Sequence, residues 1–245
     1  MKNKQQKVAI FDIDGTLFRS SLLIELVEKL MEEKILPEDS YQGFNKEKQE
    51  WMERKGSYEN YINAVIKTYS DSIKGIKYRD FMEVGRMVVE EQKWQTYTYT
   101  RSLVEKLKKN NYYLLAISQS PKGILDEFCN NFNFDKVYGR IYELGPEDRL
   151  TGEVRELHLI ANKANIVKRA VEKEDLTLKD SVGVGDTEGD ISFLEMVEHP
   201  LCFNPNKNLY RHALISDWNV VVERKDVIYH IKRSTSYPEI LNSDQ

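Results

Sequence analysis

Val8-Ala9-Ile10-Phe11-Asp12-Ile13-Asp14-Gly15 is the stretch that decides the fold of this 245-residue chain. The four apolar residues at 8–11 are typical of a strand that is buried on both faces of a parallel sheet. Side chains two positions apart on an extended segment point the same way, so Asp12 and Asp14 can converge on one site before Gly15 turns the chain. Two converging carboxylates repel unless a cation, a proton or acid/base chemistry separates their roles. The stretch therefore indicates a functional site at a strand end.

Charge and hydropathy exclude several classes of partner. The chain has 36 Lys+Arg and 40 Asp+Glu, a net charge of -4, and its charges are interspersed. No basic face for nucleic acid or for an anionic membrane is implied, so we expect neither partner. The sequence shows no secretory signal and no apolar span of about 20 residues, which favours a soluble, cytoplasmic protein. Cys129 and Cys202 are interpreted as reduced core residues. The oligomeric state is left open.

The order of patterns predicts an α/β fold with a helical insertion. After Leu17 the apolar spacing becomes helical and remains so over about 20–95. From Thr100 onward helical and strand-like patterns alternate, which indicates a parallel sheet. The later strands are expected at 112–117, 137–139, 181–184, 201–203 and 220–222, with a small hairpin at 140–144 and 150–154 and an uninformative polar stretch after Glu223. We predict a Rossmann-like core domain, 1–18 and 97–245, and an all-helical cap domain, 19–96.

The second core strand ends in polar residues. Ser118 and Gln119 follow the apolar run at 112–117, and Ser120 and Pro121 are predicted to be the cap and the first residue of the next helix. A hydroxyl group and free amides at a helix start can bind an anion. A simple capping turn is the alternative. Ligands of parallel sheets bind beyond the carboxyl ends of the strands, where Asp12 also lies.

A second group of carboxylates follows the strand at 181–184. Asp186 stands at the strand end and Asp190 follows four residues later. Carboxylate oxygens are ligands for magnesium, which commonly shares its coordination sphere with phosphate. Thr187 and Asp190 also fit a capping box, a structural role that leaves Asp186 free. Lys163, at an expected helix start, would by itself be interpreted as a solvated surface residue.

These residues together resemble a known superfamily. Asp12-x-Asp14-Gly15-Thr16-Leu17, Ser118, Lys163 and Gly185-Asp186-x-x-x-Asp190 resemble the four ordered motifs of the haloacid dehalogenase superfamily in its phosphatase form, over roughly 1–18 and 97–222. Ile117-Ser118-Gln119-Ser120-Pro121, the hairpin ending in Leu150-Thr151-Gly152-Glu153, and Phe203-Asn204-Pro205 resemble its phosphoserine-phosphatase-like branch. A helical cap inserted after the first motif matches that branch.

The resemblance implies a phosphatase acting on a small phosphorylated metabolite. It implies that Asp12 attacks phosphorus to form an aspartyl phosphate and that Asp14 is the general acid and base. Mg²⁺ would be held by the Asp12 carboxylate, the Asp14 main-chain carbonyl and Asp186. The phosphoryl group would be bound by Ser118, Gln119 and Lys163. Asp190 would orient a metal-bound water or Lys163.

The substrate is less defined than the reaction. The resemblance implies that a glutamate shortly after the first motif meets the amino group of phosphoserine, and Ser21 occupies that place here. Gly189 also replaces an asparagine of the last motif. We therefore predict another small phosphomonoester, whose leaving group is recognised by Tyr58 and Tyr61. The alternative for these tyrosines is packing within the cap core.

Several functions remain open on the sequence alone. A phosphoserine phosphatase, or a phosphotransferase or mutase, would use the same site with a different substrate or acceptor. A catalytically inactive binding or regulatory protein with the same fold is an alternative of another class. The joint retention of the carboxylates, Ser118 and Lys163 argues against the inactive protein.

Overall fold

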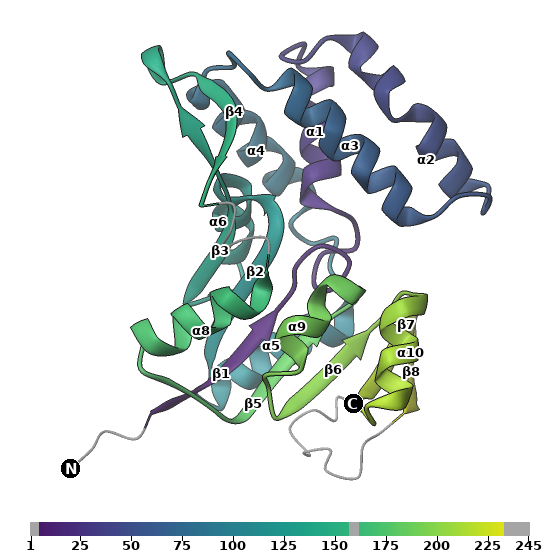
Figure 1. Ribbon diagram of the computed structural model, residues 1–245, viewed down its shortest axis with the longest axis vertical. Coiled ribbons are helices and arrows are strands. Elements are labelled where there is room, and N and C mark those ends of the chain that lie inside the picture. Colours follow the sequence, from purple (N-terminus) through teal and green to yellow (C-terminus); the bar gives the residue numbers. More distant parts are fainter. Residues whose placement is uncertain (1–4, 157–161, 233–245) are drawn as a thin grey trace.

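The computed structural model describes residues 5–156 and 162–232 and has an α/β architecture (Figure 1). An eight-stranded sheet has the order β4-β3-β2-β1-β5-β6-β7-β8. β1 (Gln6–Phe11) lies near its centre, in parallel between β2 (Tyr113–Pro121) and β5 (Leu176–Gly185). The remaining strands are β3 (Lys136–Leu144), β4 (Leu150–Arg155), β6 (His199–Phe203), β7 (Asn219–Arg224) and β8 (Val227–Lys232). The predicted parallel sheet is confirmed.

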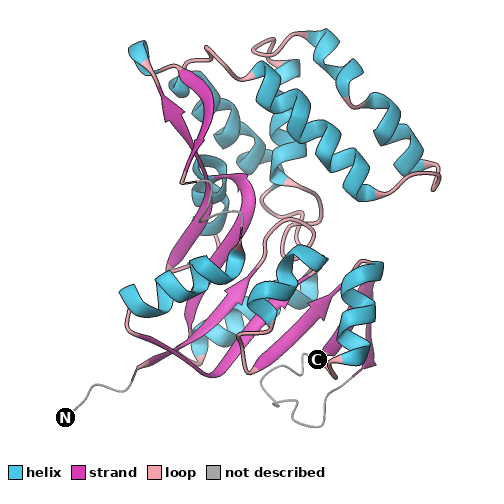
Figure 2. Ribbon diagram, in the orientation of Figure 1, coloured by secondary structure: helices cyan, strands magenta, loops and turns pink. Residues whose placement is uncertain are grey.

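Helices cover both faces of this sheet (Figure 2). The helices are α1 (Leu22–Glu32), α2 (Asn45–Met52), α3 (Tyr58–Ser72), α4 (Tyr78–Gln92), α5 (Thr98–Lys109), α6 (Lys122–Asn130), α8 (Lys163–Lys173), α9 (Ile191–Leu194) and α10 (Lys207–Ile215). Short 3-10 helices span Glu38–Gly43, Pro146–Asp148 and Glu188–Asp190.

Alternate residues of β1 enter two separate hydrophobic clusters. Ala9 and Phe11 pack with residues of α1, α3, α4, α5 and α6, whereas Val8 and Ile10 pack with residues of α8, α9 and α10. All four side chains are fully buried. The strand is therefore covered on both faces, as its continuous apolar run predicts. This burial fixes the position at which Asp12 emerges.

The helical insertion lies between β1 and β2. Figure 1 shows α1, α2 and α3 beyond the point where β1 ends, and α4 next to the β3–β4 hairpin of the sheet. The chain leaves and returns through adjacent segments, because the Arg19 N–H donates to the Gln95 carbonyl at 2.8 Å and the Tyr97 N–H donates to the Leu17 carbonyl at 3.1 Å. The predicted insertion of a helical segment after the first strand is confirmed.

The hairpin of β3 and β4 reaches the inserted helices. The Leu150 N–H donates to the Ile76 carbonyl at 2.9 Å, and the Tyr142 ring meets the Tyr69 ring of α3 edge to face, with centroids 5.5 Å apart. The segments 137–139 and 140–144, expected as two strands, form the single strand β3. The insertion thus contacts the sheet through this hairpin as well as through its two linkers.

One local prediction is wrong, and one stretch that the sequence did not define has regular structure. β2 continues through Pro121 and α6 begins at Lys122, so Pro121 precedes the helix and the Ser120 side chain does not cap it. The polar stretch after Glu223 contains a strand, β8, which pairs antiparallel with β7.

Two further observations concern the cysteines and the helices. Cys129 and Cys202 are buried and free of disulfides. Within the residues described, the structure contains no helix that combines the length and the apolar character needed to cross a membrane.

Candidate active site

Two strand ends and a short 3-10 helix bring three carboxylates together. Asp12 follows β1, Asp186 follows β5, and Asp190 ends the short 3-10 helix after it. Carboxylate oxygens of these three residues lie within 4.8 Å of one another. Asp12 is 6 % exposed and Asp190 is fully buried. The carboxylates that the sequence predicted to meet across the sheet therefore do meet.

A lysine lies between two of these carboxylates. Lys163 begins α8, whose start is capped by Asn162, and its Nζ is 2.5 Å from Asp12 Oδ1 and 2.5 Å from Asp190 Oδ1. Only 6 % of Lys163 is exposed. A buried lysine with two carboxylate partners is a fixed positive charge, which excludes the surface role considered for it from the sequence alone.

Asp190 connects this ion pair to the backbone. Its Oδ2 accepts hydrogen bonds from the Asp186 N–H at 3.0 Å and from the Thr187 N–H at 3.1 Å. The predicted capping box of Thr187 and Asp190 is present. Asp190 therefore holds both the Lys163 ammonium group and the segment that carries Asp186.

The charges of the cluster are unbalanced. Burial raises the pKa of Asp12 to about 7, opposed by the charge of Lys163. Burial, followed by the charges of Asp12 and Asp190, raises the pKa of Asp186 well above its usual range. Burial alone would lower the pKa of Lys163, but the charges of Asp12 and Asp190 outweigh it and raise that pKa. A divalent cation would relieve this excess of carboxylate charge, so the donor set fits a metal such as Mg²⁺.

The turn after β1 touches the Asp186 carboxylate. Gly15 has a φ of +80°, and a Cβ at this position would lie 2.2 Å from Asp186 Oδ2. The Thr16 hydroxyl donates to Asp186 Oδ1 at 3.3 Å. The absence of a side chain at position 15 thus allows Asp186 to approach the carboxylates of β1.

The Asp14 carboxylate turns toward β2 and is held by three donors. Its Oδ1 accepts from the Leu22 N–H at 2.6 Å, and its Oδ2 accepts from the Ser120 hydroxyl at 2.8 Å and from the Ser118 hydroxyl. Ser118 and Ser120 are 1 % and 2 % exposed. Sequence reasoning missed Ser120, although the spacing of two from Ser118 on an extended segment could have indicated a shared direction.

Gln119 points to a different partner. Its side-chain Oε1 accepts a hydrogen bond from Arg140 Nε of β3 at 3.1 Å. Arg140 also lines a cavity of about 530 Å³ between α4, the start of α6 and the β3–β4 hairpin. The phosphate-binding role of Gln119 stays a prediction.

The two tyrosines predicted for specificity have different surroundings. Burial, followed by the charges of Asp14 and Asp186, raises the pKa of Tyr58 far above its usual value. For Tyr61, burial followed by the charges of Glu28 and Glu25 raises the pKa. The pKa of Tyr58 is therefore affected by the carboxylate cluster, whereas the pKa of Tyr61 is affected by two glutamates of α1. The two tyrosines could not be distinguished from the sequence, because they lie three residues apart on one helix face.

Ser21 and Glu25 are the residues to consider near the position of the missing glutamate. Ser21 is 3 % exposed and directly precedes α1. The two oxygens of Glu25 accept from the Ser20 hydroxyl at 2.7 Å and from Gln92 Nε2 at 2.7 Å. Glu25 thus joins α1 to the end of α4.

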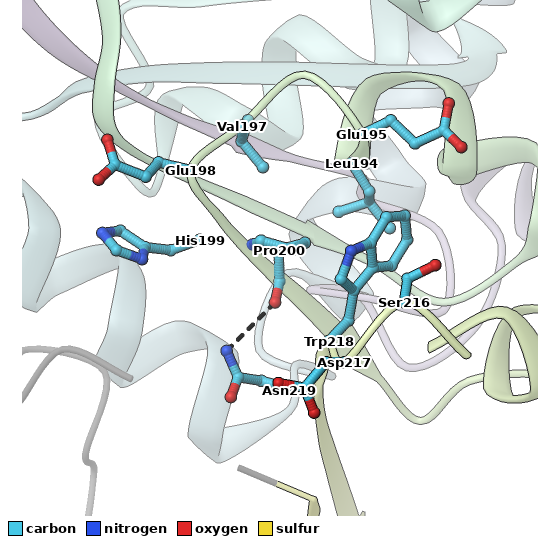
Figure 3. A pocket seen from close by; sticks show the side chains of 10 residues that line it. All are labelled: Leu194, Glu195, Val197, Glu198, His199, Pro200, Ser216, Asp217, Trp218 and Asn219. Atoms are coloured by element: carbon cyan, nitrogen blue, oxygen red, sulfur yellow. Dashed lines mark hydrogen bonds between the residues drawn. The ribbon is translucent and has the colours of Figure 1, made fainter. Parts of the chain in front are cut away.

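A second hollow lies at the opposite edge of the sheet. Figure 3 shows this hollow, of about 510 Å³, at the start of β6 and β7, where the Asn219 amide donates to the Pro200 carbonyl at 3.3 Å. His199, Glu198 and Asp180 lie close together there, but Asp180 is already paired with Lys7 at 2.8 Å. None of the predicted site residues lines this hollow.

The site thus consists of buried carboxylates at the carboxyl edge of a largely parallel α/β sheet, next to a helical insertion after the first strand. The chain belongs to the haloacid dehalogenase-like hydrolase family, whose model matches residues 9–195. The resemblance inferred from the four motifs is thereby confirmed.

Relatives and solved structures agree with this assignment. The chain is 23 % identical over 209 residues to a phosphoserine phosphatase of Archaeoglobus fulgidus, a match that covers 84 % of this chain and 55 % of that protein. The chain spans about half the length of the curated relatives it matches. A protein of unknown function from Bordetella pertussis has a similar structure, with a TM-score of 0.69 and 14 % identity over 89 % of this chain and 98 % of that one. The structure of a phospho-aspartyl intermediate analogue of phosphoserine phosphatase has a TM-score of 0.61 and 20 % identity, over 91 % of this chain and 96 % of that one.

Proposed function

We propose that the protein is a magnesium-dependent phosphatase that hydrolyses a small phosphomonoester through an aspartyl phosphate on Asp12. The observation that carries the proposal is the buried pair of Asp12 and Lys163, flanked by Asp186 and Asp190. We also propose that 19–96 acts as a cap domain over a core domain formed by 1–18 and 97–245.

The chemistry proceeds in two displacements. Asp12 Oδ attacks phosphorus, so that an aspartyl O–P bond forms while the ester P–O bond breaks, and Asp14 gives its proton to the departing ester oxygen. Asp14 then takes a proton from a water molecule, which attacks phosphorus and breaks the aspartyl bond. Phosphate leaves, and Asp12 and Asp14 return to their starting states.

The remaining groups stabilise charge on the transferring phosphoryl group. Lys163 supplies a fixed positive charge beside Asp12, and Ser118 and Gln119 supply hydrogen bonds from the end of β2. Mg²⁺, when bound by the Asp12 carboxylate, the Asp14 main-chain carbonyl and Asp186, supplies further positive charge. Asp190 keeps the Lys163 ammonium group in place, because its Oδ1 accepts a hydrogen bond from Lys163 Nζ at 2.5 Å.

The substrate that fits best is a small phosphomonoester other than phosphoserine. Phosphoserine carries an ammonium group, which requires a counter-charge near the leaving group. Ser21 is neutral, and Glu25, the next carboxylate along the chain, is held by the side chains of Ser20 and Gln92. The name of the Archaeoglobus relative is the observation that favours phosphoserine, at 23 % identity.

Phosphate release from a panel of esters tests the reaction and the substrate together. With Mg²⁺ present, we expect release from p-nitrophenyl phosphate and from several small phosphorylated metabolites, with no preference for phosphoserine. Chelation with EDTA should lower the rate at least about 100-fold, because the metal's charge stabilisation is lost, and added Mg²⁺ should restore it. No release from any ester would contradict the proposed function, and a clear preference for phosphoserine would contradict only the substrate.

Tyr58 and Tyr61 form a matched pair for testing contact with the leaving group. The charges of Asp14 and Asp186 act on the Tyr58 hydroxyl, so this hydroxyl is a candidate to contact the leaving group. We expect Tyr58→Phe to lower kcat/KM about 10-fold on some esters and little on others. Tyr61→Phe should change all esters by less than about twofold. Equal losses on every ester, together with a lower melting temperature, would show that Tyr58 only packs within the inserted helices.

A further inference from the structure

Ser118 has one hydroxyl proton and two possible uses for it. In the structure this hydroxyl donates to Asp14 Oδ2, and its oxygen accepts from the Ser120 N–H at 2.9 Å. The proposed function requires the same proton to be donated to a phosphoryl oxygen. Because a hydroxyl group supplies only one donor, Ser118 must release Asp14 when it binds the phosphoryl group.

Ser120 is placed to keep Asp14 in position after that release. Its hydroxyl donates to the same Oδ2 atom at 2.8 Å, while the Leu22 N–H holds Oδ1 at 2.6 Å. Ser120 is 2 % exposed, and the N-cap residue of α6 is Pro121 rather than Ser120. The hydroxyl of Ser120 therefore has no role in starting the helix and is committed to Asp14.

We propose that Ser120 is a positioning residue for the general acid. In this inference, which rests on the proposed function, Ser118 changes its hydrogen-bond acceptor from Asp14 to the phosphoryl group. Ser120 and the Leu22 N–H then hold the Asp14 carboxyl group against the departing ester oxygen. Both serines are needed, but for different partners: Ser118 for the phosphoryl group and Ser120 for Asp14.

The leaving group decides how much this positioning matters. As the Asp12–phosphorus bond forms and the ester bond breaks, an alkoxide must receive the Asp14 proton, whereas p-nitrophenolate departs without one. A misplaced Asp14 therefore slows alkyl esters more than p-nitrophenyl phosphate. A merely structural role of Ser120 would slow both esters alike.

The test compares kcat/KM for p-nitrophenyl phosphate and for an alkyl phosphate, the best one in the ester panel, on the full chain with Mg²⁺. We expect Ser120→Ala to raise the ratio of aryl to alkyl kcat/KM by about 10- to 100-fold, the effect of losing a hydrogen bond to a charged group. Ser120→Thr, which keeps the hydroxyl, should return the ratio toward the wild-type value. The thiol of Ser120→Cys has a similar size but is a weak hydrogen-bond donor, so this variant should behave like Ser120→Ala. It replaces Ser120→Ala in the comparison if the alanine variant does not fold.

Two controls separate this role from others. Ser181→Ala removes a fully buried hydroxyl of β5 that donates to the Leu178 carbonyl, and it should leave the ratio within about threefold. Ser118→Ala should reduce both esters strongly, because it removes phosphoryl binding. An unchanged ratio in Ser120→Ala and Ser120→Cys would overturn the proposal, whereas a wild-type protein that hydrolyses neither ester would overturn the proposed function instead.

Discussion

Replacement of Asp12 by asparagine is expected to lower kcat for phosphate release by at least about 10⁴-fold, because the amide cannot attack phosphorus. The substitution keeps the size of the side chain at the end of β1. Asp12 is 6 % exposed, so few alternative nucleophiles can reach the same position. Phosphate release measured under saturating ester and Mg²⁺ checks this expectation directly.

The folded state should survive Asp12→Asn. Burial disfavours the charge of Asp12, and the charges of Asp190 and Asp14 add to the rise of its pKa. Asparagine carries no charge, so it removes the cost of burying a charge and the repulsion from Asp190 and Asp14, but it also loses the ion pair with Lys163. Lys163 keeps Asp190 as a partner at 2.5 Å. We expect the melting temperature to change by less than about 4 °C. A folded Asp12→Asn protein with substantial activity would show that another residue is the nucleophile.

The sequence allowed the positions of the carboxylates to be predicted because they depend on strand ends. A continuous apolar run locates β1, the short segment 181–184 locates the end of β5, and parallel strands present their carboxyl ends at one edge. Asp12 and Asp186 had to meet there once the strands were parallel neighbours. Lys163 was different, since only the resemblance of the ordered motifs lifted it above an ordinary surface lysine.

The hydrogen-bond partners within the site could not be predicted in the same way. Ser120 followed by proline has the local chemistry of a helix cap, yet β2 extends through Pro121 and turns the Ser120 hydroxyl to Asp14. The choice between these roles depends on where β2 ends, and that is decided by its pairing with β3 rather than by its own residues. The different surroundings of Tyr58 and Tyr61 likewise depend on how α3 is seated over the sheet.

The second expectation concerns Gly15, where the structure predicts a larger effect than one added methyl group would suggest. Its φ of +80° disfavours any side chain, and a Cβ would lie 2.2 Å from Asp186 Oδ2. Gly15→Ala must therefore move the Asp186 carboxylate, the proposed metal ligand. A displacement of about 1 Å within an active site costs about 100-fold in rate, so we expect kcat/KM to fall at least that far and more Mg²⁺ to be needed for half-maximal activity.

Gly75→Ala is the matched control for the backbone. Gly75 has a φ of +87°, and no atom lies within 4 Å of the place where its Cβ would be. Both substitutions carry the same conformational strain, about 1 kcal/mol, which lowers the melting temperature by about 2–4 °C in a chain of this size. The loss of activity and the altered Mg²⁺ dependence should appear only in Gly15→Ala, since only there does the methyl group meet Asp186. Wild-type Mg²⁺ dependence in Gly15→Ala would show that metal binding does not need the Asp186 carboxylate where the structure places it.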